Sequence, residues 1–303
     1  LPFVSFLKTR QPAPITGIGR VLSPNFASAH DIYDLRGCVS MNTRSYQFFL
    51  EYILRVVPPK TSFSLWYTGD NPIENNIGVP YGNYQNDHLQ AFKRAFPFFI
   101  LAGTRYVVCP NRLLDQIKTL RQRGMKKIYS REVDIWQLPA RPPAYIAHKA
   151  QIISMVSDTR RWGTTIASDN EVLTGKKVIL EETPPGNLWE GEPNSSDRAE
   201  LITGNNPNRL QVRFYTENPG YLVINRAYTN LLRAYLEGEK MPIIRANGPF
   251  LAIPVLGKNK EQVLELTYVS PLTKCSFILS ILGLLIVGGG LVLAVIKKRP
   301  SRH

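Results

Sequence analysis

The sequence predicts an α+β (α/β-like) extracytoplasmic domain, followed by a small β-sandwich and one C-terminal transmembrane helix. Three observations indicate this arrangement. Helix-like and strand-like patterns interleave up to about residue 180. Short alternating segments, separated by turn signals, run from 199 to 271. An uncharged run of 22 residues, Cys275–Ile296, then leads into a basic tail.

The first domain, residues 1–180, opens with an amphipathic segment and combines three predicted helices with two predicted strands. Apolar residues at helical spacing indicate the helices, and Gly124 is expected to end the third. Short apolar or alternating stretches indicate the strands, the first of which is closed by Pro110. The segment is PFVSFLK (2–8), the helices are expected in RSYQFFLEYILRVV (44–57), HLQAFKRAFPFFILAG (88–103) and RLLDQIKTLRQRGMKKIYS (112–130), and the strands in TRYVVCP (104–110) and VDIWQLP (133–139).

A change of composition separates the two domains. Residues 181–198 are rich in Pro, Gly and acidic side chains and are expected to form a linker. The β-sandwich is expected at 199–271, with a hairpin turn at Glu237–Lys240. Its strands are expected in RLQVRFYT (209–216), GYLVINRAY (220–228), FLAIPVLG (250–257) and QVLELTYV (262–269), together with the two arms of the hairpin.

The run Cys275–Ile296 is long enough to cross a membrane. As a helix it would measure about 33 Å at about 1.5 Å per residue, against about 30 Å for a bilayer core. The basic tail, 297–303, is expected in the cytoplasm, which places the preceding domains outside the cell membrane. Small side chains on one helical face predict packing against other helices, although Gly is also generally common in membrane helices. This face consists of Ser276, Ser280, Gly283, Gly290 and Ala294.

The composition is strongly basic, with a net charge of +14. Such a charge suits a surface near anionic lipid headgroups or anionic glycans, and it also fits a merely solvated basic surface. We do not expect a nucleic-acid partner, because the basic residues are scattered and the domains are expected to be extracytoplasmic.

Candidate chemical groups are few. Asp31 and Asp34 could act as acid and base or as metal ligands, but Asp34 could equally pair with Arg36 in a structural turn. Arg245 and Asn247 could form a hydrogen-bonded corner or a glycan-facing surface. We expect no catalytic, metal or cofactor site in this chain by itself, because no convergent set of such residues is present in its motifs.

Other motifs are weaker. The stretch GIGR at 17–20 has neither the third glycine nor the preceding strand of a dinucleotide-binding loop. Cys38 and Cys109 could pair in an oxidising compartment, but two cysteines do not define a disulfide framework.

Several motifs together resemble the extracytoplasmic C-terminal region of YfhO-type bacterial membrane proteins, which are related to GT-C glycosyltransferases. The resemblance covers nearly the whole chain and is most specific at 220–271. Thr229–Leu231 stand where the family usually has Pro-Gly-Trp, and Cys38-Val39 where it tends to have Tyr-Asp. The matching residues are Pro24, Asn25, Asp31, Asp34, Arg36 and Gly37, followed by Tyr221, Gly238, Arg245, Ala246, Asn247, Gly257 and Tyr268.

The resemblance implies that the chain is an accessory region of a multi-spanning glycosyltransferase-like membrane protein. Its terminal run would be the last helix of a bundle whose other helices precede Leu1. The parent protein would use a polyprenyl-phosphate sugar donor, and the acidic loop that catalyses transfer lies outside this chain. The chain would then help to bind a cell-envelope glycan or an anionic polymer. The alternative is a stand-alone, single-span surface protein that binds a glycan or a protein partner.

Overall fold

The computed structural model describes residues 2–10, 14–17, 30, 32, 49, 84–116, 124–139, 141–185, 188–189, 191–202, 209–269, 279–281 and 283–288. In this part of the chain the structure is mostly β, with 38% strand and 23% helix arranged around three sheets. The predicted fold class is therefore wrong in its balance of helix and strand. Much of the strand content lies between residues 126 and 180, where the sequence analysis predicted few strands.

The predicted C-terminal transmembrane helix is also corrected. Among the described residues, no helix has both the length and the apolar character needed to cross a membrane. Within the run Cys275–Ile296, the described residues are 279–281 and 283–288, and both stretches are helical.

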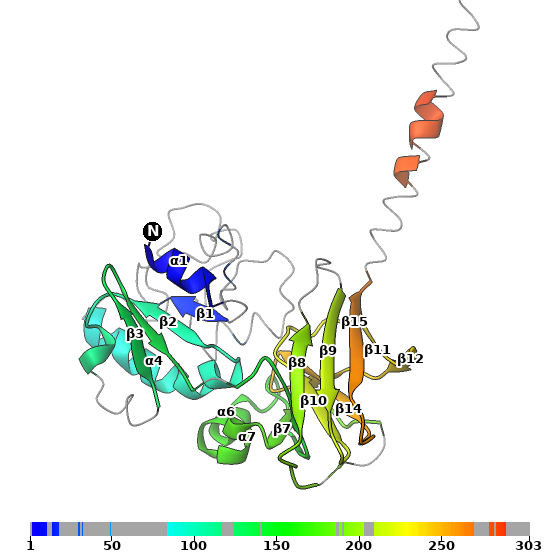
Figure 1. Cartoon of the computed structure of the whole chain (residues 1–303), viewed down its shortest axis with the longest axis horizontal. Coiled ribbons are helices and arrows are strands. Elements are labelled where there is room, and N and C mark those ends of the chain that lie inside the picture. Colours follow the sequence, from blue (N-terminus) through cyan, green and yellow to red (C-terminus); the bar gives the residue numbers. More distant parts are fainter. Residues whose placement is uncertain are drawn as a thin grey trace, which may run out of the picture.

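The first lobe, called the N-terminal lobe below, is built on a four-stranded sheet in the order β1-β2-β4-β3 (Figure 1). β1 and β2 run parallel, whereas β4 is antiparallel to both of its neighbours. Helix α1 packs its buried face against this sheet through a small apolar cluster. The elements are α1 (Pro2–Lys8), β1 (Ile15–Gly17), α4 (Tyr84–Leu101), β2 (Tyr106–Cys109), η5 (Leu114–Gln116), β3 (Lys126–Ser130) and β4 (Asp134–Gln137).

Several predicted elements of this lobe are confirmed. The amphipathic segment forms α1, the helix before Gly103 forms α4, and the two predicted strands form β2 and β4. Two predictions are wrong: β3 lies in the stretch that was assigned to a helix, and β1 precedes the GIGR motif. The predicted helix at 44–57 lies outside the described residues, apart from Phe49.

The second sheet has six strands in the order β5-β10-β14-β13-β7-β6. β5 and β6 occupy its opposite edges, yet only His148 separates them in the sequence. The strand therefore bends at His148, so that the sheet curls round between its two edges; this six-stranded sheet is called the barrel below. The strands are β5 (Ala144–Ala147), β6 (Lys149–Ile152), β7 (Lys177–Leu180), β10 (Gly220–Ile224), β13 (Ile244–Ala246) and β14 (Phe250–Val255).

The inside of this barrel is apolar and closely packed. Every one of its strands contributes side chains to a single cluster that includes Tyr145, Tyr221 and several alanines. The bend itself is fixed by His148, whose Nδ1 lies 2.8 Å from the Pro219 carbonyl and whose Nε2 lies 2.8 Å from Asp197 Oδ2. His148 thereby connects the bend to the residues that precede β8 and β10.

A five-stranded antiparallel sheet covers one outer face of the barrel and completes a β-sandwich-like region, called the sandwich below (Figure 1). Its predicted hairpin is confirmed, with the turn at Glu237 and Gly238, both of which have positive φ. The predicted strands in this region are also present. In order, the strands of this sheet are β12 (Glu239–Met241), β11 (Leu232–Leu236), β15 (Gln262–Tyr268), β9 (Arg209–Tyr215) and β8 (Arg198–Ile202), of which β8 was not predicted.

The barrel combines strands from both sides of the domain boundary that was expected at residue 180, since β5 pairs with β10 and β7 pairs with β13 as well as with β6. Two short helices, α6 (Thr159–Ser168) and α7 (Asn170–Thr174), connect β6 to β7.

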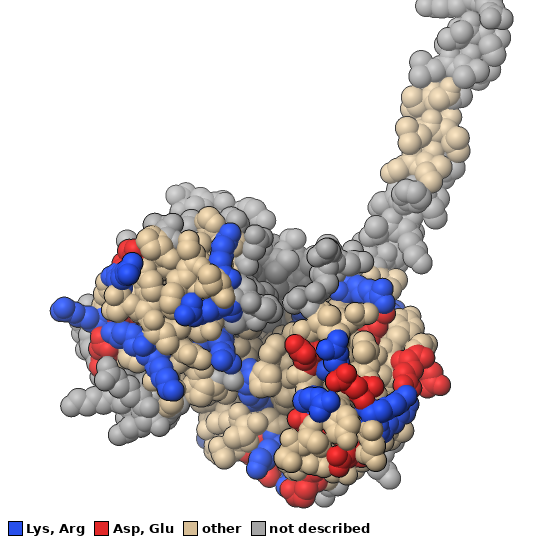
Figure 2. Space-filling model, in the orientation of Figure 1, with Lys and Arg blue, Asp and Glu red and all other residues tan. Residues whose placement is uncertain are grey.

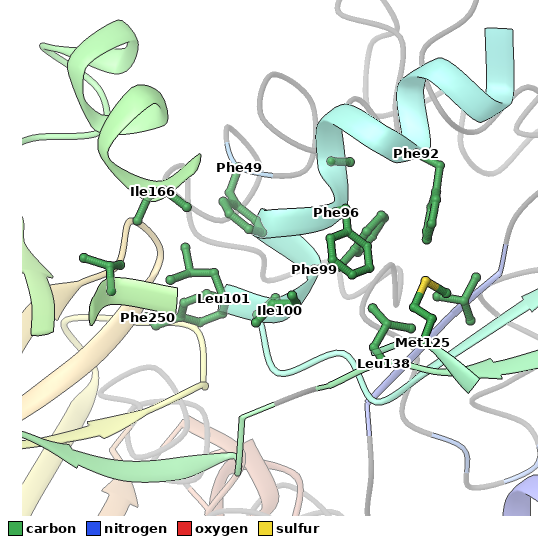
Figure 3. Packing of buried hydrophobic residues seen from close by; sticks show 14 of the residues in the cluster. Phe49, Phe92, Phe96, Phe99, Ile100, Leu101, Met125, Leu138, Ile166 and Phe250 are labelled. Carbon is green, nitrogen blue, oxygen red and sulfur yellow. The ribbon is translucent and has the colours of Figure 1, made fainter. Parts of the chain in front are cut away.

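One apolar core joins the N-terminal lobe to the sandwich (Figure 3). Helix α4 supplies Phe92, Phe96 and Phe99, and the barrel side supplies Ile166 and Phe250. Phe98 of α4 stacks on Trp162 of α6, with ring centroids 5.7 Å apart. The two regions therefore share a continuous interior.

Candidate functional site

Asn247 lies at the tip of the hairpin between β13 and β14 and is completely buried. Its φ of +48° and the φ of +85° at Gly248 are left-handed, a region that Asn and Gly adopt more readily than other residues. Its side chain accepts a hydrogen bond from the backbone N–H of Ile179 at 3.0 Å and donates one to the Tyr145 hydroxyl at 2.8 Å. This geometry favours a structural corner over a glycan-facing group.

Arg141 continues the same hydrogen-bond chain. Its Nη1 donates to the Tyr145 hydroxyl, and its Nε donates to the Leu173 carbonyl at 2.9 Å. The Leu173 carbonyl belongs to the last turn of α7, where backbone carbonyls favour a cation. Arg141 therefore neutralises the end of a helix inside the protein.

Glu181 is a partly buried acid next to Arg245. It follows β7, and its backbone N–H donates to the Arg245 carbonyl at 2.9 Å. Its Oε2 accepts from the Met155 N–H at 2.8 Å, whereas its Oε1 is buried and has no hydrogen-bond partner among the described residues. Burial raises the pKa of Glu181 to about 7, although the Met155 N–H and the charge of Arg245 act in the opposite direction.

Arg245 also lies near an aromatic ring. Its guanidinium carbon is 5.9 Å from the ring centroid of Tyr228, at the outer range of a cation–π contact. Sequence reasoning identified Arg245 and Asn247 but missed Glu181, because a single acid carries no recognisable signal in the sequence.

Asp134 is a buried carboxylate in the N-terminal lobe. It accepts hydrogen bonds from Ser130 Oγ at 2.6 Å, from the backbone N–H of Arg112 at 2.7 Å and from Lys127 Nζ at 2.9 Å. Burial by itself would raise the pKa of Asp134, but these three donors hold it below its usual value. Lys127 also pairs with Asp115 at 2.6 Å, so two carboxylates share one ammonium group.

Cys109 lies beside this cluster as a free, buried thiol. Burial and the nearby charge of Asp134 raise its pKa to about 12, which suppresses the reactive thiolate. Cys38, its suggested partner, lies outside the described residues.

The exposed charges of the N-terminal lobe are almost all positive (Figure 2). Among the side chains that the structure describes there, Glu132 is the single exposed acid, and its carboxylate accepts a hydrogen bond from the Tyr129 hydroxyl. Seven cations are exposed, and none has an ion pair within the described part of the chain. They are Lys8, Arg10, Lys93, Arg105, Arg112, Lys126 and Arg131.

The sandwich has a different surface, on which positive and negative side chains alternate (Figure 2). Many of its exposed cations are paired with acids on neighbouring strands or turns. Examples are Arg209 with Glu265, Arg198 with Glu261, and Lys258 and Lys260 with Glu237. Among the described residues, the basic excess that faces solvent is therefore concentrated on the N-terminal lobe.

Other predicted site residues fall outside the described residues, namely Asp31, Asp34, Arg36, Ser276, Gly290 and Ala294. Ser280 and Gly283 lie in the two short described stretches near the C-terminus. Within the described part of the chain, no group of three or more His, Cys, Asp or Glu side chains could hold a metal ion.

No protein-family model, curated protein or solved structure matches this chain significantly. The resemblance to YfhO-type proteins therefore stays a prediction.

Proposed function

We propose that this chain is an extracytoplasmic accessory region that binds an anionic cell-envelope polymer for a membrane protein of the GT-C glycosyltransferase type. The observation that carries the binding role is the one-sided charge of the N-terminal lobe. Exposed cations without local acids attract polyanions, whereas paired cations contribute little to such a field.

The link to sugar transfer rests on the sequence resemblance. In that role the parent protein would take a sugar from a polyprenyl-phosphate donor, and this chain would hold the acceptor polymer close to the transfer site. The mixed-charge sandwich would act as the support that positions the N-terminal lobe, because one apolar core joins the two regions.

Binding of the full chain to poly(glycerol phosphate), with neutral dextran as the control polymer, tests the binding role. We expect binding to weaken about tenfold or more between about 50 and 200 mM salt, because each phosphate contact releases counterions. Dextran should not bind. A full chain that fails to bind the polymer at low salt would refute the proposed function.

Two matched variants locate the binding surface. The first replaces the seven exposed cations of the N-terminal lobe by Gln. The second replaces an equal number of exposed sandwich cations by Gln, namely Lys176, Arg198, Arg209, Arg213, Lys240, Lys258 and Lys260. Both variants lose the same charge, but we expect only the first to lose polymer binding. Equal loss would mean that net charge, rather than the lobe, determines binding.

The gene tests the class of the parent protein. Several hydrophobic spans upstream of Leu1, with an acidic first outside loop, would support a GT-C-type parent. An upstream region that encodes only a short signal would contradict it.

A further inference from the structure

The carboxyl ends of three strands meet at one edge of the sheet in the N-terminal lobe. β1 and β2 are parallel, with Gly17 beside Val108. β3 ends at the same edge, because Ser130 pairs with Asp134 and Asp134 pairs with Cys109. In sheets with parallel strands, ligands commonly bind just outside the carboxyl ends. This edge is called the carboxyl edge below.

Arg112 is held in an uncommon conformation at the carboxyl edge. Its φ is +64°, which costs a residue with a side chain about 1–2 kcal/mol. Its backbone N–H donates to Asp134 Oδ2 at 2.7 Å, and Asp134 is fixed in turn by Lys127 and Ser130. A buried carboxylate therefore sets the direction of the loop from which the exposed Arg112 side chain leaves.

A second arginine is connected to this loop. The side chain of Asn111 donates to the Arg131 carbonyl at 2.7 Å and so joins the loop after β2 to the turn between β3 and β4. Arg112 and Arg131 thus leave the backbone from two segments that one hydrogen bond ties together. Both side chains are exposed, and neither has an ion pair within the described residues.

The acids near this edge are already engaged. Asp134 accepts its three hydrogen bonds, Asp115 pairs with Lys127, and Glu132 accepts from the Tyr129 hydroxyl. Lys127 offsets part of the charge of Asp115 and Asp134, whereas Glu132 keeps its charge and interacts with the neighbouring Arg131. Neither arginine forms an ion pair with a carboxylate among the described residues, so both guanidinium groups can contact an external anion. The guanidinium group suits a phosphate diester well, because its fork of N–H donors matches two phosphate oxygens.

We propose that Arg112 and Arg131 form the phosphate-binding centre of the N-terminal lobe and hold a phosphodiester group of the polymer at the carboxyl edge. This inference rests on the proposed function and specifies where the polymer is bound. The remaining exposed cations of the lobe then contribute a general attraction, whereas these two make the direct contacts.

The test compares two double variants of the full chain in their binding to poly(glycerol phosphate). R112Q/R131Q removes the centre. R105Q/K126Q is the matched control, because Arg105 and Lys126 are exposed cations of the same lobe at the opposite, amino edge of the sheet. We expect Kd to rise at least about tenfold in the first variant and less than about threefold in the second. R112K/R131K keeps the charge and should recover only part of the affinity.

The outcomes separate this inference from the proposed function. Equal weakening by both double variants would overturn the phosphate-binding centre and leave a diffuse basic surface, which the proposed function allows. Unchanged affinity in R112Q/R131Q would also overturn the centre. A wild-type chain that binds phosphatidylglycerol vesicles but not the polymer would overturn the proposed function in favour of lipid headgroups. Thermal melting of each variant ensures that only folded protein is compared.

Discussion

The N-terminal lobe and the sandwich each bury a carboxylate, but they stabilise it to different extents. Asp134 in the lobe has three donors and stays ionised, with its pKa below the usual value. Glu181 in the sandwich has one oxygen without a partner among the described residues, and its pKa is raised to about 7. Burial acts on both groups and prevails at Glu181, whereas at Asp134 the three donors and the charge of Lys127 outweigh it.

The two regions also differ in how many of their exposed cations are paired with acids. The sandwich pairs many of its exposed cations with acids on adjacent strands or turns, whereas the exposed cations of the lobe have no such pairs within the described part of the chain. A charge that is balanced locally stabilises the fold slightly, and one that is not balanced remains available to a partner. This difference supports the proposed division into a supporting region and a binding region, which share one apolar core.

The largest effect is expected where the two regions share their core. Gly248→Ala would place a Cβ 2.6 Å from Met155 Sδ and 3.0 Å from the ring of Trp162, at a φ of +85°. Strain and overpacking together should cost about 2–4 kcal/mol in the free energy of unfolding. Gly238→Ala is the control, because its φ is +87° but no atom lies within 4 Å of the added Cβ. Urea unfolding of both variants measures the difference, and equal costs would show that packing at the joint is loose.

The next largest effect on stability is expected at Asp134, the buried acid of the lobe. Asp134→Asn removes the negative charge that interacts with Lys127 and accepts from the Arg112 N–H. It should lower the free energy of unfolding by about 2–3 kcal/mol. Because the pKa of Asp134 is lowered, its contribution is present above the ordinary Asp pKa of about 3.9 and is lost as pH falls further. Unfolding curves between pH 2 and 7 should therefore show an acid-dependent loss in the wild type that is reduced in the variant. Identical pH dependence would contradict the assignment.

Glu181, the buried acid of the sandwich, should give stability the opposite dependence on pH. Because the pKa of Glu181 is raised to about 7, the folded state holds this proton more tightly than the unfolded state. Its contribution is fully present below the ordinary Glu pKa of about 4.3 and is lost as pH rises through about 7. Glu181→Gln should remove this dependence and stabilise the protein by about 1–2 kcal/mol at pH 8. Calorimetry at pH 5 and pH 8 measures the difference in stability between this variant and the wild type. A variant that is less stable than the wild type at pH 8 would refute the expectation.

The smallest effect is expected on the surface of the sandwich. Arg209→Gln breaks the exposed pair with Glu265 and should change the free energy of unfolding by less than about 1 kcal/mol. Polymer binding should not change, because this cation is balanced by a neighbouring acid. A loss of binding in this variant would remove the distinction between the two surfaces.

The sequence predicts the later strands better than the earlier ones for a physical reason. RLQVRFYT alternates because one face of β9 packs on the barrel and the other meets water. β5 was not predicted, because it is short and buried on both faces, so its apolar residues run without alternation. β3 was missed because the residues before it have helical spacing, and its lysines face solvent or the Asp134 cluster.

The candidate site could be predicted only in part. The basic composition indicated an anionic partner, but the sequence does not show that the sandwich neutralises its own cations through pairs between distant strands. Arg112 could not be identified either, because its importance follows from the pairing of β2 with β4, which brings Asp134 to its backbone N–H. The sequence left Asn247 as either a corner or a glycan-facing group, and only its buried hydrogen bonds to Ile179 and Tyr145 favour the corner.

The bent strand at His148 has a consequence for the order of folding. β6 can pair with β7 soon after synthesis, because the connecting residues form two short helices. β5 has to wait until β10 has been made, and the loop that it closes is much longer. Long-range closure of this kind slows folding. During synthesis, the apolar side of β5 therefore stays open until the ribosome has passed residue 224, which makes this interval the time at which a chaperone would be most useful.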